Sequence, residues 1–315
     1  MGWIRFAIGL FVFALGVRTA SADAPVVLRL GTLAIDGSRY MKDVLALSQE
    51  LEKRTRGAVR LDWVSDGRLG DERAMVDLIT AGKLDGGGFS ETGLTALVPD
   101  MIVWRYPGLF RTYEEVDRAT AALAPAVRER FARRDLVFVM WADLGFAQLF
   151  STERPAGVAD LLGRAGPLLT MPLDQQLIGE VASGRARAWA LPPLYVLAIG
   201  QARARYLSAL RYSYVVGGLV LSRAAWARMH PADQATFLEV CRAWEPRLRD
   251  SWRRETERGV AALVKTGARI VPVSDAELAS FTEASVRGRA EHAARAGLTE
   301  LLGQIAGSID ARGAP

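Results

Sequence analysis

The sequence predicts an α/β protein built on an open, mostly parallel sheet. Apolar stretches of strand length alternate with stretches whose apolar residues recur at helical spacing, as in α/β folds. An unbroken apolar run at residues 136–141 suits a strand that is buried on both faces. Residues 231–266 are helical in pattern for most of their length, which is long enough to span more than one domain.

The first elements form a β-α-β unit. Alternation of apolar residues predicts strands at residues 27–30 and 59–63. Between them, residues 41–51 carry apolar side chains at helical spacing, and this helix ends at Gly57.

The same alternation continues along the chain. Residues 71–81 repeat the helical pattern, with Gly82 as the stop signal, and residues 84–89 are predicted to form the next strand. A further apolar strand is predicted at residues 219–221, and Pro246 is expected to kink the long helix that follows.

Length and composition exclude several classes of protein. At 315 residues the chain has room for about two domains. Hydrophobic residues make up 50% and charged residues 24%, which excludes a disordered chain. The 40 Lys and Arg outweigh the 35 Asp and Glu by only +5, so a nucleic-acid partner is not expected.

Cysteine and histidine are too few for a disulfide framework or a zinc site. Cys241 has no second cysteine within the chain to pair with, and His230 and His292 do not form a metal-ligand spacing with it. No cofactor is expected.

The pattern of residues 1–22 predicts a secretory signal peptide. Arg5 precedes an apolar run at residues 6–17, and Ala20-Ser21-Ala22 forms a cleavage site of the A-x-A type. The run is shorter than the roughly 20 residues that span a bilayer. An exported protein without disulfides favours a bacterial periplasm.

Motifs of catalysis are incomplete. Residues 88–92 lack the second glycine of a G-x-S-x-G nucleophile elbow. Gly86-Gly87-Gly88 is followed by no phosphate-binding pattern, so a crowded strand end is the favoured interpretation. His230 at a helix entry is expected to be solvated rather than a general base. An enzyme is therefore not expected.

Large aromatic residues gather at predicted strand ends and in connecting loops. Ligands of open α/β sheets bind outside the carboxyl ends of the strands, so this placement suggests a binding site. Core packing is expected to account for at least half of these residues.

Three motifs resemble the solute receptors of TRAP transporters, the periplasmic binding proteins of tripartite ATP-independent carriers. They are residues 64–75 (VSDGRLGDERAM), 81–85 (AGKLD) and 106–110 (YPGLF). Further likeness at residues 141–145, 154–163, 183–193 and from Gly217 onward extends the resemblance over nearly the whole mature chain.

The resemblance implies a two-lobed periplasmic binding protein fold with a long helix bridging the lobes. Such receptors hold a small-molecule ligand in the cleft, close by a hinge motion and deliver the solute to membrane permease subunits. By analogy, residues 23–145 plus 217–244 form lobe I. Residues 146–216 plus 245–315 form lobe II, which is shortened.

The sequence differs from the family at the two positions whose arginines bind the solute's carboxylate. An Arg usually follows the Gly-Phe of the crossing strand, and a second Arg lies past an Asp-Leu-x-Gly turn. Here the first position is Ala147, and the second falls near Arg164 without the usual Lys-x-Arg. Arg187 and Arg223 stand where the family often has Asp and Asn.

These differences change the class of ligand that we expect. A buried carboxylate without its cation would be unpaired, so a less polar or bulkier ligand than a simple organic acid is expected. By the resemblance, Glu91 matches an acidic position of sialic-acid receptors, and Arg211 aligns with a polar site residue there. The candidate ligand-binding residues are Trp63, Phe89, Phe146, Trp189 and Tyr212 as walls, with Glu91 and Arg211 as polar contacts.

Two hypotheses follow. The main one is a periplasmic solute receptor of a TRAP-type secondary transporter. The alternative is a protein with the receptor fold that has no role in ligand transport and acts as a protein-binding partner or regulator, which the shortened second lobe and the missing arginines motivate.

Overall fold

The computed structural model describes residues 24–169, 175–199 and 203–310. The predicted signal peptide, residues 1–22, lies outside the described residues.

The described strands form one seven-stranded sheet in the order β2-β1-β3-β6-β4-β5, with β7 beside β6. The strands are β1 (Val26–Thr32), β2 (Val59–Val64), β3 (Gly86–Ser90), β4 (Leu136–Ser151), β5 (Ala188–Leu191), β6 (Tyr206–Ser222) and β7 (Arg269–Val271). The sheet is mixed rather than mostly parallel. β1 is parallel to β2 and β3, and β7 is parallel to β6, but β6 is antiparallel to both β3 and β4, and β5 is antiparallel to β4.

β4 and β6 run side by side through the whole sheet, pairing from Leu136 with Ser222 to Ser151 with Tyr206. At one end β6 also pairs with β3, and at the other end it pairs with β7 while β4 pairs with β5. We call the part of the sheet around β1, β2 and β3 the first half, and the part around β5 and β7 the second half. The two long strands therefore join the halves.

Helices fill the connections between these strands. The α-helices are α1 (Arg39–Arg54), α2 (Glu72–Thr80), α3 (Glu91–Leu97), α4 (Tyr113–Ala132), α5 (Val158–Ala165), α6 (Gln175–Ser183), α7 (Pro193–Ile199), α8 (Arg223–Ala227), α9 (Pro231–Lys265), α10 (Asp275–Ala296) and α11 (Thr299–Asp310). Two 3-10 helices are η1 (Pro99–Arg105) and η2 (Gly166–Leu169).

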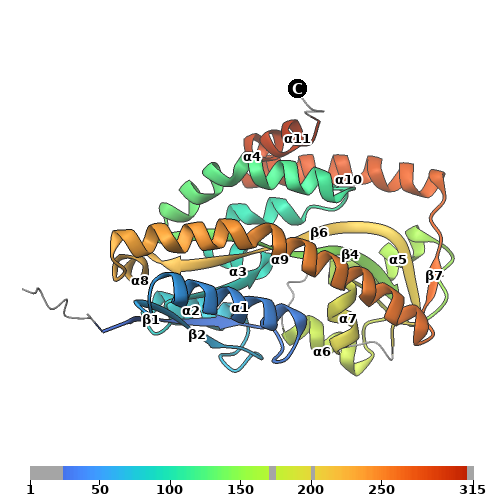
Figure 1. Cartoon of the computed structure of the whole chain (residues 1–315). Helices are drawn as coiled ribbons and strands as arrows, with labels where there is room; N and C mark the ends of the chain where they lie inside the picture. Colours follow the sequence, from blue (N-terminus) through green and yellow to red (C-terminus); the bar gives the residue numbers. More distant parts are fainter. Residues whose placement is uncertain (1–23, 170–174, 200–202, 311–315) are drawn as a thin grey trace, which may run out of the picture.

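Both faces of the sheet are covered, which makes the molecule layered (Figure 1). On the first half, one face packs against α2, α3, η1 and α4, and the other face packs against α1, α8 and α9. On the second half, α6, α7 and the end of α9 form one apolar cluster, and α5 with Phe281 of α10 belongs to another. Each half thus has its own core on each face.

The long helix α9 bridges the halves, as the sequence predicts. Its Phe237, Val240 and Trp252 are buried in the core of the first half. Its Leu263 is buried in a cluster of the second half. Figure 1 shows α9, in orange, running along the length of the molecule, and Pro246 lies inside the helix.

The C-terminal helices pack on the opposite side from α9. Leu301, Ile305 and Ile309 of α11 are buried in the cluster that contains Val116 and Leu123 of α4. This packing groups α11 with the first half, whereas the predicted boundaries assign residues 245–315 to the second lobe. The division into lobes stays a prediction.

The predicted elements of the first half are present with small shifts at their ends. The two long strands differ most, because β4 and β6 extend far beyond the predicted residues 136–141 and 219–221. Polar residues such as Asp143, Gln148 and Arg211 interrupt the apolar pattern there, and register shifts mark irregularities in the pairing.

The glycine run at residues 86–88 is a crowded strand, as the sequence favours. β3 lies between β1 and β6. A Cβ on Gly86 would overlap the backbone of Val220, and one on Gly87 would lie 2.5 Å from the carbonyl oxygen of Gly31. Side chains at these positions would push the strands apart.

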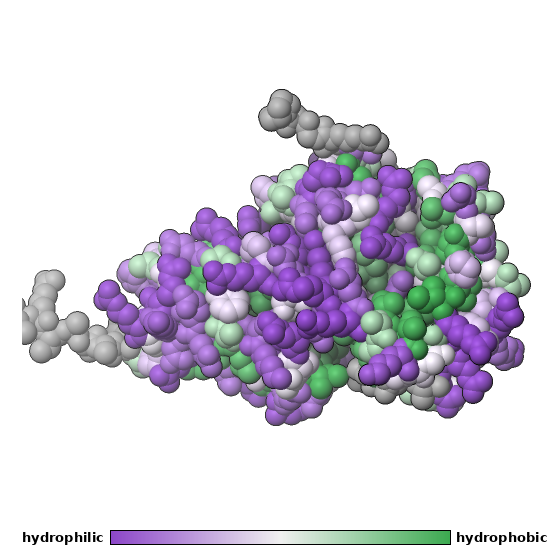
Figure 2. Space-filling view, turned by 45° about the vertical axis from the view of Figure 1, so that its right-hand side comes forward, coloured by the Kyte–Doolittle hydropathy of each residue, from purple (hydrophilic) through white to green (hydrophobic). Residues whose placement is uncertain are grey.

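The surface of the described residues is mostly hydrophilic in the view of Figure 2, with hydrophobic residues gathered toward its right-hand side. Exposed hydrophobic side chains include Val264 of α9, Ile270 of β7, and Leu278 and Val286 of α10. Among the described helices, none combines the length and the hydropathy needed to cross a membrane.

Candidate functional site

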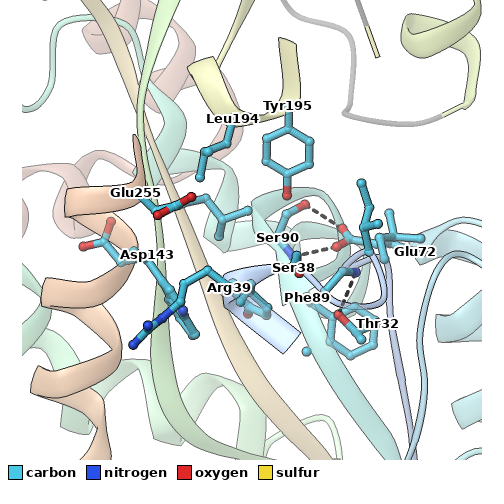
Figure 3. Close-up of a pocket in the computed structure, with 17 residues that line it drawn as sticks. Thr32, Ser38, Arg39, Glu72, Phe89, Ser90, Asp143, Leu194, Tyr195 and Glu255 are labelled. Carbon is cyan, nitrogen blue, oxygen red and sulfur yellow. Dashed lines mark hydrogen bonds between the residues drawn. The ribbon is translucent and has the colours of Figure 1, made fainter. Parts of the chain in front are cut away.

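A cavity of about 280 Å³ lies between the two halves, at the carboxyl ends of β1 and β3. Thr32 ends β1, and Ser90 ends β3. Leu194 and Tyr195 of α7 line it from the second half, and Leu144 of β4 and Trp252 of α9 come from elements that join the halves. The topology therefore brings elements of both halves to one site, and Figure 3 shows their side chains.

A buried carboxylate forms one end of the cavity. Glu72, at the first turn of α2, is 3% exposed and accepts hydrogen bonds from Ser90 N (2.6 Å), Ser90 Oγ (2.7 Å) and Gly93 N (2.6 Å). Burial, aided by the charge of Glu91, raises the pKa of Glu72 from 4.5 to about 7. This side chain caps the N-terminus of α3, where Ser90 is the N-cap residue.

Aromatic side chains form much of the wall. The ring of Tyr40 on α1 stacks on Trp252, with ring centroids 4.0 Å apart. Tyr195 and Phe89 line the same cavity. Burial first and the charge of Glu72 second raise the pKa of both Tyr40 and Tyr195, so these phenols stay protonated at neutral pH. In Figure 3 the Tyr195 hydroxyl points toward Ser90 and Glu72.

Asp143 of β4 also lines the cavity, but its charge is paired. Arg253 of α9 donates from Nε to Asp143 Oδ2 at 2.7 Å and makes a two-point contact with Asp117 at 3.0 and 2.7 Å. Asp143 is 7% exposed, and its burial raises its pKa while Arg253 opposes that shift. The network ties α9 to α4 and β4 beside the cavity.

The described lining residues include one cation, Arg39. Its guanidinium contacts Asp43 at 3.0 Å and Ser251 Oγ at 3.1 Å, and its side chain is 55% exposed. In Figure 3 this group points away from Tyr195 and Ser90. The charge of Arg39 is thus already paired at the rim.

A second, smaller cavity of about 30 Å³ is lined by Ala147, where the resemblance implies an arginine. Its lining also includes Glu91, Arg105 and Tyr212. Glu91 is 4% exposed and lies 3.6 Å from Arg105 through Oε1 and Nη1. Burial raises the pKa of Glu91, and Arg105 opposes the shift. This space holds about one water molecule rather than a solute.

The structure brings three of the predicted site residues to these cavities. Phe89 lines the large one, and Glu91 and Tyr212 line the small one. The cavities lie near each other, because Ser90 lines the first and its neighbour Glu91 lines the second.

The other four predicted residues lie outside both cavities. Trp63 packs against the apolar cluster that α1, α8 and α9 form on the first half, and it donates from Nε1 to Ser48 Oγ at 3.0 Å. Trp189 is fully buried in the second half against Phe150. Phe146 is buried against Tyr214, with Arg211 stacked over its ring at 4.5 Å.

The three arginines at or near positions where the resemblance implies other residues form ion pairs. Arg164 pairs with Asp160 at 2.7 Å, Arg187 pairs with Glu153 at 2.7 Å, and Arg223 lies 3.5 Å from Asp135. None of the three lines the large cavity.

Sequence reasoning missed several lining residues, chiefly Glu72, Asp143 and Trp252. Glu72 lies inside a family motif, but nothing in a motif shows that its carboxylate turns toward a cavity. Tyr40 and Trp252 come from two helices that are adjacent only in the folded chain. The carboxyl ends of the predicted strands were the one available signal.

The described residues that line the large cavity include no cysteine or histidine. Cys241 is buried in the core, and burial raises the pKa of its thiol. Within the described ranges, no group of three or more His, Cys, Asp or Glu side chains is placed to hold a metal ion.

The sequence matches a family model. Residues 30–165 match the bacterial extracellular solute-binding protein family 7. An uncharacterized protein of Salmonella typhimurium, YiiZ, is 28% identical over 167 residues, covering 52% of this chain and 50% of that one. A solute-binding protein of Chromohalobacter salexigens is 20% identical over 259 residues, covering 74% and 75%. The match thus spans about half of the first relative.

Solved structures share the fold. A TRAP periplasmic solute binding protein from Desulfovibrio salexigens, with bound orotic acid, superposes with a TM-score of 0.81 at 16% identity over 90% of this chain and 99% of that chain. One from Polaromonas, bound to D-erythronate, gives 0.78 at 20% identity over 91% and 99%. The resemblance and the fold class predicted from the sequence are confirmed.

Proposed function

Because this chain is a relative of the TRAP-type periplasmic solute-binding proteins, we propose that it is the solute receptor of a TRAP-type secondary transporter. It binds a small molecule in the cavity between the two halves and delivers it to membrane permease subunits. Family 7 consists of extracellular solute-binding proteins, which supports a periplasmic location and a receptor rather than an enzyme.

The observation that carries the proposal is the cavity itself. Its volume of about 280 Å³ suits a small metabolite, and its walls come from both halves. A solute there contacts β1 and β3 on one side and α7 on the other, so its binding favours a closed arrangement of the halves. The strands β4 and β6 and the helix α9 are the connections about which the halves would move.

The proposed solute is not a simple carboxylate held by two arginines. Ala147 stands where the family has its first arginine, and Arg164 is engaged with Asp160 on α5. The relatives named above are bound to acids, whereas the described cavity walls offer only the paired Arg39 as a cation. A hydrophobic ligand stays a prediction, supported by the aromatic walls.

The alternative, a regulator without a solute, is not favoured. A protein that binds no solute does not need an open cavity between its halves with buried polar groups at one end, because such cavities are typical of ligand sites. Here Glu72, Tyr40 and Tyr195 are held at such an end.

Native mass spectrometry of gently purified, exported protein tests the proposal. We expect an added small-molecule mass that is lost on denaturation, and stabilisation of the emptied protein when that molecule is returned. A protein that carries no added mass and is stabilised by no member of a broad metabolite screen contradicts the receptor function.

The export route is tested on the same preparation. We expect the periplasmic fraction to contain a chain that begins at Asp23, since cleavage follows Ala22. Intact mass measurement distinguishes this chain from one that keeps residues 1–22, which would contradict the proposed signal peptide.

A further inference from the structure

We propose that the cavity takes an organic cation, a solute whose ammonium group lies among Glu72, Tyr40 and Tyr195. This inference rests on the proposed receptor function, because it names the class of solute for the same cavity. It differs from the carboxylate solutes of the relatives named above.

The charges on the cavity wall favour a cation. Three carboxylates line the cavity, Glu72, Asp143 and Glu255, against the single cation Arg39. Arg39 is paired with Asp43, Asp143 with Arg253, and Glu255 with Arg258 at 3.3 Å. An anionic solute would therefore meet no unpaired cation among the described lining residues, whereas Glu72 has no cationic partner among them.

Glu72 is the group that lacks a counter-charge. Its carboxylate accepts three hydrogen bonds from Ser90 and Gly93, all from neutral donors. Among the described residues, no ion pair includes Glu72, and the groups that shift its pKa are burial, Ser90, Gly93 and Glu91, with no cation among them. Burial favours the protonated form of Glu72, so a cation brought next to it would stabilise the ionised carboxylate and lower its pKa.

Aromatic rings supply the second attraction. Tyr40, Phe89, Tyr195 and Trp252 surround the same cavity as Glu72. The faces of such rings attract ammonium groups, most strongly where water is excluded. In Figure 3, Tyr195 reaches down from α7 to the Ser90 and Glu72 pair, which places a ring from the second half over the carboxylate of the first.

The two attractions act from opposite sides of the cavity. Glu72 lies on α2 in the first half, and Tyr195 lies on α7, which packs in the second half. A cation held between them links the halves, whereas a carboxylate at the same place would be repelled by ionised Glu72 and would find no cation there. The chemistry of recognition and the closing of the receptor thus depend on the same pair of side chains.

Matched probes that differ only in charge test this inference on the wild-type protein. One series is choline, its neutral isostere 3,3-dimethylbutan-1-ol and the acid 3,3-dimethylbutanoate. The other is benzylammonium, benzyl alcohol and benzoate. In isothermal titration calorimetry we expect a cation to bind at least tenfold more tightly than its neutral and acidic counterparts in at least one series.

Two substitutions locate the effect. We expect Glu72→Gln to weaken binding of the cation at least tenfold while leaving the neutral probe unchanged. Because Glu72 also caps α3, Tyr195→Leu serves as a second variant that leaves this cap intact, and we expect it to weaken the cation similarly. Tyr206→Leu, at the far end of β6, is the matched control and should bind like wild type.

The outcomes separate this inference from the receptor function. Equal or tighter binding of a neutral or acidic probe overturns the inference and leaves a solute receptor. Absence of cation binding in both series also overturns it. If native mass spectrometry and the metabolite screen find no solute at all, the receptor function fails as well.

Discussion

The ring of Tyr40, at the start of α1, stacks on the indole of Trp252 in the middle of α9, with centroids 4.0 Å apart and an interplanar angle of 21°. The contact joins the first helix of the fold to the helix that bridges both halves. Because both rings line the large cavity, the same contact stabilises the fold and shapes the wall.

We expect Trp252→Ala to destabilise the protein strongly. Trp252 is 4% exposed, and removal of a large buried aromatic side chain typically lowers the free energy of unfolding by about 3–5 kcal/mol. Trp252→Phe keeps an aromatic ring against Tyr40 and should cost less than half as much. Urea unfolding of the three proteins measures the difference, and equal losses in both variants would contradict a role for the stack.

Arg253 is expected to matter for stability through the carboxylates that it pairs. Its side chain is 11% exposed and that of Asp143 is 8% exposed, so Arg253→Met leaves a buried, unpaired charge. Breaking such a pair from one side costs about 3–5 kcal/mol. Chemical unfolding at pH 7 checks this loss.

A double variant is the control for that prediction. Arg253→Met with Asp143→Asn removes the unpaired charge, so it should recover part of the stability that Arg253→Met loses. The single variant should also become relatively more stable as the pH falls, because Asp143 then binds a proton in the folded state. No recovery in the double variant would show that Arg253 acts by packing alone.

The sequence predicts the fold of this chain better where its elements are local. The β-α-β unit of β1, α1 and β2 is confirmed because each element carries its own periodicity. The lengths of β4 and β6 were missed, since Asp143 and Arg211 break the apolar pattern in strands that pass between the halves. The mixed direction of the sheet also depends on pairing between distant segments, which periodicity does not encode.

The sequence indicates where the cavity forms, but it identifies only some of the residues that line it. The carboxyl ends of β1 and β3 indicate where a cavity forms, and Phe89 at the end of β3 lines it. The sequence places many large aromatic residues near strand ends. It does not distinguish Tyr195, which lines the cavity, from Trp189, which is buried in a core. Both are aromatic residues near a strand end, and only tertiary packing distinguishes them.

Glu72 should make stability depend on pH. Its folded pKa of about 7 lies above its ordinary value of 4.5, so between these values the folded state binds more protons than the unfolded state. The free energy of unfolding therefore falls as the pH rises from about 4.5 to about 7, by about 3 kcal/mol for this group.

Comparison with Glu72→Gln isolates that contribution. The variant cannot ionise, so its stability should fall less than that of wild type across the same pH range, while Glu91 and Asp143 act in both proteins. Glu239→Gln is the control, because Glu239 is exposed and pairs with Arg54 at the surface. Parallel pH profiles for wild type and Glu72→Gln would show that Glu72 does not titrate in this range.

Ala147→Arg introduces the arginine that the resemblance implies at this position, and we expect it to destabilise the fold. Ala147 is 3% exposed and lines a cavity of about 30 Å³ that already contains the Glu91 and Arg105 pair. A long side chain there overpacks the site, at a cost of about 1–3 kcal/mol, and places two guanidinium groups beside one carboxylate. Removing Arg105 in the double variant Ala147→Arg, Arg105→Ala vacates space and leaves one cation for Glu91. A double-mutant cycle in urea should therefore show a favourable coupling of about 1 kcal/mol or more between the two positions. If Ala147→Arg is as stable as wild type, the cavity is more adaptable than its packing indicates, and Arg105 does not prevent an arginine at position 147.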